Sequence, residues 1–255
     1  MSLPAGQEDA AYRFDWGPNG LRALAGRCDV VVVVDVLSFT TAVDVAVARG
    51  CSLLPYRWHD GAGAFAADRG AELAVERDAL DAHHPWSLSP ASLRSLAPGT
   101  RLVLPSPNGS ALAFAAREAG ARHVLAGCLR NASAVAAAAR RLDGGRGIAV
   151  LAAGERWHGD TGPLRVAVED LLGAGAVLAA LDPSGSLSPP RCSPEAGAAR
   201  AAFVAARPLL HDALAGSTSG RELIARGFAD DVALAAELDA STTAPVLEDD
   251  AFVAA

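Results

Sequence analysis

Polar side chains follow several short apolar runs of this sequence, at the point where each run ends. In an open parallel sheet, ligands bind beyond the carboxyl ends of the strands. If the apolar runs are strands of one sheet, we expect these side chains to meet along one edge of it and to bind a small ligand there. The residues of these polar clusters are Asp35, Ser106, Asn108, Gly109, Ser110, Asn131, Glu155 and Arg156.

Asp35 ends a run of five valines, Val30–Val34, and an apparent helix begins shortly after it. Mg²⁺ prefers one or two carboxylates together with water and phosphate oxygens, so Asp35 is a candidate metal ligand. An acid just before a helix also caps free backbone N–H groups. The sequence alone leaves both interpretations open.

The turn Ser106-Pro107-Asn108-Gly109-Ser110 opens an alanine-rich segment with helical character. Small residues leave backbone N–H groups open to an anion, and the helix dipole favours negative charge at that end. The turn matches neither the P-loop pattern nor the dinucleotide-binding glycine pattern. We therefore expect either a phosphate-binding turn or a capped turn without a ligand.

Glu169 and Asp170 are adjacent in a long apolar run. Neighbouring residues point about 100° apart on a helix, so one of the two acids must approach the apolar side. A buried acid is unfavourable unless it is paired or bound to a metal, which makes the pair a candidate for metal binding. The alternative is a solvated helix start in which both acids interact with the dipole.

Forked arginine donors suit phosphate and sulfonate oxygens. The candidates near the expected site are Arg77, Arg130 and Arg156. Three histidines, His83, His84 and His158, are candidate proton carriers, although loop residues without a catalytic role are the more common case.

The expected elements alternate between strand and helix, which favours a three-layer α/β/α fold with a mostly parallel or a mixed sheet. Residues 1–255 are expected to form one domain, with a Pro- and Ser-rich loop around 183–194. The expected strands cover 30–34, 52–56, 73–75, 101–104, 123–126 and 147–152, with an edge strand at 246–247. The expected helices cover 42–49, 62–69, 111–119, 132–142, 164–181, 195–214, 220–226 and 230–238.

The composition argues against several function classes. The formal net charge is −7 and no basic run is present, so nucleic acid is not an expected partner. No apolar run reaches the roughly 18 residues of a membrane span, and the first residues do not resemble a signal peptide, so we expect a cytoplasmic protein. The four cysteines form no CxxC pair, which argues against zinc. A homodimer is the base-rate expectation.

Six segments, in their order along the chain, resemble the successive sequence blocks of the 2-phosphosulfolactate phosphatase family. The resemblance covers residues 29–247, most of the chain. The segments are residues 32–41, 106–110, 131–135, 153–155, 169–175, and 219–221 with 230–232.

This resemblance implies a three-layer α/β/α enzyme that uses magnesium to remove phosphate from a small sulfonated or carboxylated acid. In the family, the step yields sulfolactate on the way to coenzyme M. The resemblance also places Asp35, Asn108, Gly109, Glu169 and Asp170 at the core of the site.

The chain departs from the family pattern at Ser38, where the family usually has arginine, and around Arg77, where flanking glycines are missing. Losing an arginine fork weakens recognition of a doubly charged substrate, so we expect a different and less charged substrate. A descendant that binds an anion or metabolite without catalysis is the alternative. A nucleotide-dependent enzyme is disfavoured by the missing glycine patterns, and a serine hydrolase by the missing GxSxG.

Overall fold

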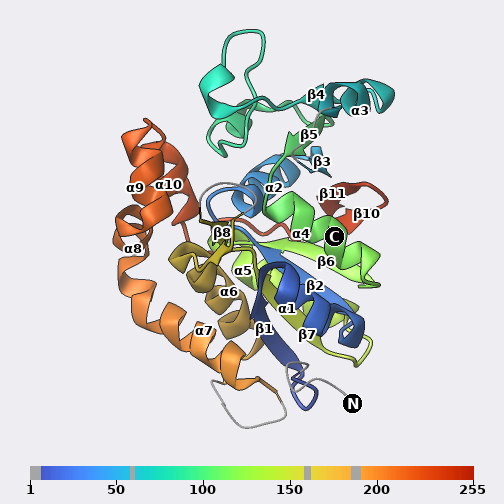
Figure 1. The fold of residues 1–255 in the computed structure, drawn as a ribbon, viewed down its shortest axis with the longest axis vertical. Coiled ribbons are helices and arrows are strands. Elements are labelled where there is room, and N and C mark those ends of the chain that lie inside the picture. Colours follow the sequence, from blue (N-terminus) through green and yellow to red (C-terminus); the bar gives the residue numbers. More distant parts are fainter. Residues whose placement is uncertain (1–6, 58–60, 158–161, 185–190) are drawn as a thin grey trace.

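The protein is described by a computed structural model that covers residues 7–57, 61–157, 162–184 and 191–255 (Figure 1). Within these ranges, nine strands form one sheet in the order β1-β7-β2-β6-β10-β11-β3-β5-β4. Helices cover both faces of the sheet, which confirms the predicted α/β class. The strands of the sheet are β1 (Tyr12–Trp16), β2 (Val30–Val34), β3 (Ser52–Tyr56), β4 (Glu72–Leu73), β5 (Arg101–Pro105), β6 (His123–Gly127), β7 (Ile148–Ala152), β10 (Pro245–Glu248) and β11 (Ala251–Ala254).

The valine strand β2 lies inside the sheet, between β6 and β7, and every one of its side chains is fully buried. Successive side chains of a strand point to opposite faces, so Val30, Val32 and Val34 join one core and Val31 and Val33 the other. The first core packs against α5 (Ala132–Leu142) and α6 (Val168–Leu181), and the second against α1 (Gly17–Leu24), α2 (Phe39–Ala48) and α4 (Gly109–Glu118). A smaller cluster packs α3 (Ala62–Asp68) on the β3–β5 end of the sheet.

The sheet consists of two parallel groups that a hairpin joins. β1, β7, β2 and β6 are parallel to one another, as are β3, β5 and β4. The hairpin β10–β11 pairs antiparallel with β6 on one side and with β3 on the other. Three successive antiparallel pairings reverse the direction, so the two groups run in opposite directions. The prediction of an edge strand at Val246 and Leu247 is therefore wrong, because this segment lies in the middle of the sheet.

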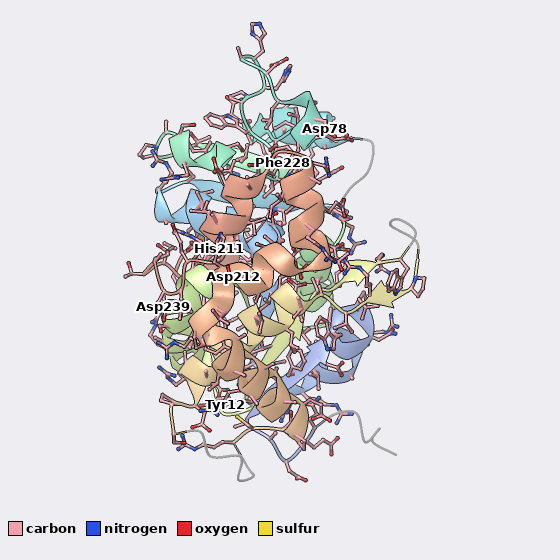
Figure 2. The ribbon with its side chains drawn as sticks, turned by 90° about the vertical axis from the view of Figure 1, so that its left-hand side faces the viewer. Tyr12, Asp78, His211, Asp212, Phe228 and Asp239 are labelled. Atoms are coloured by element: carbon pink, nitrogen blue, oxygen red, sulfur yellow. The ribbon has the colours of Figure 1, made fainter. Side chains whose placement is uncertain are left out.

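The C-terminal helices lie outside α6, on the left in Figure 1 and facing the viewer in Figure 2. They are α7 (Pro194–Ala206), α8 (Leu210–Gly216), α9 (Thr218–Ala225) and α10 (Ala229–Ala235). A single helix over 195–214 was predicted, but a short 3-10 turn with Pro208 interrupts it, since proline lacks the N–H that would continue an α-helix. Within the described residues, no helix is long and apolar enough to cross a membrane.

Two further predictions of local structure need correction. The sequence predicts no element at residues 12–24, where β1 forms one edge of the sheet and α1 follows it. It also predicts a helix that begins at 164, whereas Leu164–Arg165 is strand β9, which pairs with β8 (Glu155–Arg156) in a small hairpin, and the helix starts at Val168. Of the expected loop around 183–194, residues 185–190 lie outside the described residues.

Candidate active site

A cavity of about 500 Å³ opens beyond the ends of β2 and β5, beside the β8–β9 hairpin. Segments from both parallel groups of the sheet and from the C-terminal helix α9 form its wall. Its size lies in the range of small-molecule sites. The lining residues are Asp35, Leu37, Ser38, Arg77, Leu88, Ser106, Pro107, Asn108, Glu155, Arg156, Arg165, Thr218, Ser219, Glu222, Leu223 and Arg226.

Asp35 connects the two parallel groups of the sheet at the floor of this cavity. Its Oδ1 accepts a hydrogen bond from the Phe39 N–H at 3.3 Å, and its Oδ2 accepts one from the Gly109 N–H at 2.8 Å. Phe39 and Gly109 are the first residues of α2 and α4, so two helix N-termini converge on one carboxylate. The capping interpretation of Asp35 is thus correct, and it is compatible with a place in a ligand site because the residue also lines the cavity.

The same carboxyl group has a pKa raised to about 6, mainly because it is buried. The Glu169 carboxylate raises this pKa further, whereas the two backbone N–H groups and the Arg77 guanidinium lower it. Burial therefore raises the pKa of Asp35 by more than the two helix N-termini lower it. A cation placed among these acids would reverse the shift.

Glu169 and Asp170 are both buried, at 2% and 3% exposure, whereas the sequence required this of one of them only. Asp170 accepts a hydrogen bond from the Val36 N–H at 2.7 Å and one from the Gly154 N–H at 2.8 Å. It therefore fixes the chain just after β2 and just after β7. Its pKa lies well above the ordinary value because of burial and because Asp35, Glu169 and Glu155 are close.

Glu155 and Asn108 meet across the cavity wall. The Asn108 side-chain amide donates a hydrogen bond of 2.9 Å to Glu155 Oε2, which links the turn after β5 to the hairpin after β7. Burial, together with the charges of Asp35 and Glu169, raises the pKa of Glu155 to about 7. Glu155 can therefore gain or lose a proton near neutral pH.

Four arginines, Arg77, Arg156, Arg165 and Arg226, face these acids from the other parts of the wall. Arg156 donates to the Gly162 carbonyl at 3.0 Å, and Arg165 donates to the Ser219 hydroxyl at 3.0 Å. Arg165 also lies over the Trp157 ring, 5.8 Å from its centroid. The cavity thus has an acidic floor and a basic rim, an arrangement that can hold an anion next to a cation.

Several residues predicted for the site lie away from the cavity. Ser110 is buried and donates its hydroxyl to the Leu104 carbonyl at 3.2 Å. Asn131 is also buried, and its side chain closes the turn after β6 by accepting from the Cys128 N–H and donating to the Ala126 carbonyl. The structure therefore gives Ser110 and Asn131 local backbone contacts instead of a place on the cavity wall.

Arg130 and the histidines also lie elsewhere. Arg130 forms ion pairs with the buried Asp44, at 3.0 Å, and with Glu237, and it lines a different cavity. His83 and His84 are exposed in a loop, where the His84 ring contacts Asp81. His158 lies outside the described residues.

The prediction from sequence includes Glu155 and Arg156 of β8 but lacks the site residues of β9 and of the C-terminal helices. Arg165 was assigned to a helix, and Thr218, Ser219 and Arg226 were not considered as site residues. The signal for α9 was present, because Ser217 is an N-cap residue whose hydroxyl accepts from the Gly220 N–H at 2.9 Å. Only the three-dimensional packing brings this helix to the cavity.

The donors present fit a hard cation such as Mg²⁺. Within the described part of the chain, no three His, Cys, Asp or Glu side chains form a ready-made metal site. Mg²⁺ does not require one, since it commonly takes one or two carboxylates and completes its shell with water and substrate phosphate. Glu169 is buried among three other acids, and no hydrogen bond to its carboxylate occurs among the described residues. A buried carboxylate of this kind suits a cation.

Comparison with known proteins points to one family. The family model described as 2-phosphosulpholactate phosphatase matches residues 21–250, and so covers the whole cavity wall and every strand of the sheet except β1 and β11. The chain is 29% identical over 225 residues to a protein of Methanothermobacter thermautotrophicus named 2-phosphosulfolactate phosphatase. This alignment covers 88% of each of the two chains.

Proposed function

The chain belongs to the 2-phosphosulfolactate phosphatase family and is thus a phosphoric monoester hydrolase, and we propose that its substrate is a small phosphate ester with additional anionic groups, such as 2-phosphosulfolactate. The observation that carries the proposal is the division of one cavity into an acidic floor and a rim of four arginines. A phosphoryl group with a bound cation suits the floor. A carboxylate or sulfonate suits Arg165 and Arg226, the other two arginines of the rim.

We propose Mg²⁺ as the cofactor, held by Asp35 and Glu169. Both carboxylates belong to the buried acid cluster. Asp35 lines the cavity, whereas Asp170 does not, and both oxygens of Asp170 hold the backbone on either side of it. A bound Mg²⁺ supplies Lewis-acid stabilisation of the charge on a transferring phosphoryl group. Asp170 serves to hold Val36 and Gly154, and with them the two chain segments that carry the floor.

The residues of the chain account for the other requirements of the reaction. Arg77 and Arg156 bind phosphate oxygens and orient the ester for in-line attack. Glu155 holds or releases a proton at Oε1, because its Oε2 is occupied by the Asn108 amide. Attack by water and attack by Asp35 through a phospho-enzyme are both compatible with this arrangement.

The expectation of a less charged substrate rests on Ser38, and the cavity weighs against it. Four guanidinium groups line the cavity, and that of Arg77 donates a hydrogen bond of 2.6 Å to the Ser38 hydroxyl. A cationic group thus remains beside the position where the family usually has arginine. The retained acid cluster also counts against a descendant without catalysis, since clustered buried carboxylates disfavour the binding of an anion alone.

The substrate class can be tested with esters that differ in anionic groups: glycerol phosphate, phosphoglycolate and 2-phosphosulfolactate. We expect kcat/KM to rise along this series. Arg165→Gln should lower kcat/KM about tenfold for 2-phosphosulfolactate and much less for glycerol phosphate. Arg101→Gln, at an exposed arginine far from the cavity, is the control. Equal turnover of all three esters by the wild type would refute the proposed substrate class.

A further inference from the structure

Arg77 reaches the cavity from a segment outside the sheet, in a 3-10 turn over Arg77–Ala79. Its guanidinium makes three hydrogen bonds: Nε donates to Asp231 Oδ2 at 3.4 Å, and Nη2 donates to the Ser38 hydroxyl at 2.6 Å and to the Leu88 carbonyl at 3.2 Å. The side chain is 11% exposed. An arginine held on two sides in this way has one orientation toward the cavity.

Asp231 comes from the first turn of α10 and is 1% exposed. One of its oxygens, Oδ1, accepts from the Ser89 hydroxyl at 2.6 Å and from the Ala91 N–H at 3.1 Å. The other, Oδ2, faces Arg77 Nε. One buried carboxylate therefore fixes both the loop beside Leu88 and the guanidinium itself.

The Phe228 ring adds a second support from the same helical unit. The Arg77 guanidinium carbon lies 5.5 Å from the centroid of this ring, and that of Arg226 lies 5.8 Å from it. Arg226 also pairs with Asp78, next to Arg77, at 3.0 Å. Figure 2 shows Phe228 and Asp78 close together where the C-terminal helices meet this segment.

We propose that Asp231 is a positioning residue, which, with Phe228, aims the Arg77 guanidinium at the phosphoryl group of the substrate. Asp231 acts through Arg77 and does not itself line the cavity. The C-terminal helices then take part in phosphate binding, although they contribute no strand to the sheet. The inference rests on the proposed function in so far as it takes the bound group to be a phosphate.

Inorganic phosphate binding tests this inference without any need for turnover. We expect Asp231→Asn to weaken phosphate binding, measured by titration calorimetry, about tenfold, because the amide can keep the Ser89 and Ala91 contacts but cannot anchor Arg77. Arg77→Gln should weaken it by a similar factor, and the double variant should bind no more weakly than Arg77→Gln alone. Asp230→Asn, the same change at an exposed neighbour, should bind phosphate like the wild type.

A merely structural role gives a different pattern. Asp231→Asn would then lower the melting temperature without weakening phosphate binding. Alternatively, it would weaken phosphate binding by the same factor in the wild-type and Arg77→Gln backgrounds. Either result overturns the inference. If Asp231→Asn does not fold, Phe228→Leu decides: we expect about threefold weaker phosphate binding with Arg77 present and no effect in the Arg77→Gln background. An equal effect in both backgrounds again overturns the inference.

Kinetics with 2-phosphosulfolactate separate this inference from the proposed function. In an active wild type, Asp231→Asn should raise KM more than it lowers kcat, because the guanidinium binds the phosphate before the reaction begins. Absence of wild-type turnover would contradict the proposed function, while the phosphate titrations would still decide the role of Asp231. A loss in kcat alone with KM unchanged counts against positioning.

Discussion

Asp35 shows that helix capping, one of the two interpretations of this residue, is compatible with a place in a ligand site. It caps the first N–H of α2 and of α4, and it also lies on the floor of the cavity. Capping explains its position, and burial next to Glu169 explains its raised pKa. The residue types and their order along the chain were enough to predict this acid and the turn at Asn108, but not their contact.

The raised pKa values of Asp35 and Glu155 predict how stability depends on pH without metal. Each pKa rises from its ordinary value, 3.8 or 4.5, to about 6 or about 7. A carboxyl group with a raised folded pKa stabilises the fold below its unfolded pKa, and this stabilisation is lost as the pH rises through the folded pKa. With EDTA present, we therefore expect the melting temperature to fall between about pH 4 and 7.

Glu155→Gln should reduce the loss of stability that the protein undergoes as the pH rises. At pH 8 with EDTA we expect the variant to be more stable than the wild type by on the order of 1–3 kcal/mol, and at pH 5 we expect little difference. Thermal unfolding at pH 5, 6, 7 and 8 measures this, with Glu72→Gln at an exposed strand position as the control. A variant destabilised equally at all four pH values would show that repulsion among the acids is not the cause.

At the scale of elements, the contact between the α2 and α4 N-termini depends on Gly109. A Cβ at this position would lie 2.7 Å from Asp35 Oδ2 and would also collide with the Phe39 ring. We expect Gly109→Ala to displace α4, to lower stability by about 1–3 kcal/mol and to reduce turnover strongly. Circular dichroism melts and phosphate release measure the two effects.

Gly63→Ala provides the matched control for this change. Gly63 lies inside helix α3, and a Cβ there would meet no atom within 4 Å. The alanine should leave turnover unchanged and stabilise the protein by about 0.5–1 kcal/mol, because glycine is the poorer helix former. Normal activity of Gly109→Ala would contradict the role assigned to the contact.

The hairpin β8–β9 is an element that the sequence does not predict. Leu164 and Arg165 precede a long apolar helix and share its composition, so the sequence extended the helix over them. In the structure they pair with Glu155 and Arg156, and Gly154, at φ +67°, turns the chain into this hairpin. The pairing depends on contacts between strands of two residues each, which leave no periodic pattern.

For the whole molecule, the C-terminal hairpin decides how the two parallel groups of strands meet. Strand directions could not be predicted because the alternation of strands and helices is the same in both groups. The reversal follows from β10 and β11, which insert between β6 and β3. With the twist that accumulates across these strands, the turn after β5 still reaches Asp35.

A substitution of Phe252 in β11 tests whether the β10–β11 hairpin belongs to the cooperative core. It is fully buried, stands opposite Leu53 and packs edge to face on Phe39 with centroids 6.1 Å apart. We expect Phe252→Ala to lower the free energy of unfolding by about 3–5 kcal/mol. Urea denaturation measures the change, and Glu248→Ala, at an exposed position of the same hairpin, should be nearly neutral. An unchanged midpoint for Phe252→Ala would place the hairpin outside the cooperative core.

We propose that the acid cluster around Asp35 gives this phosphatase its dependence on Mg²⁺ and its activity on small acidic phosphate esters. The most direct test measures phosphate release from 2-phosphosulfolactate by the wild type and by Asp35→Asn, each with Mg²⁺ and with EDTA. We predict turnover by the wild type with Mg²⁺, loss of it with EDTA, and at least a hundredfold loss, roughly 3 kcal/mol in the barrier, in a folded Asp35→Asn variant. Equal turnover with Mg²⁺ and EDTA, or a fully active Asp35→Asn variant, would contradict the account.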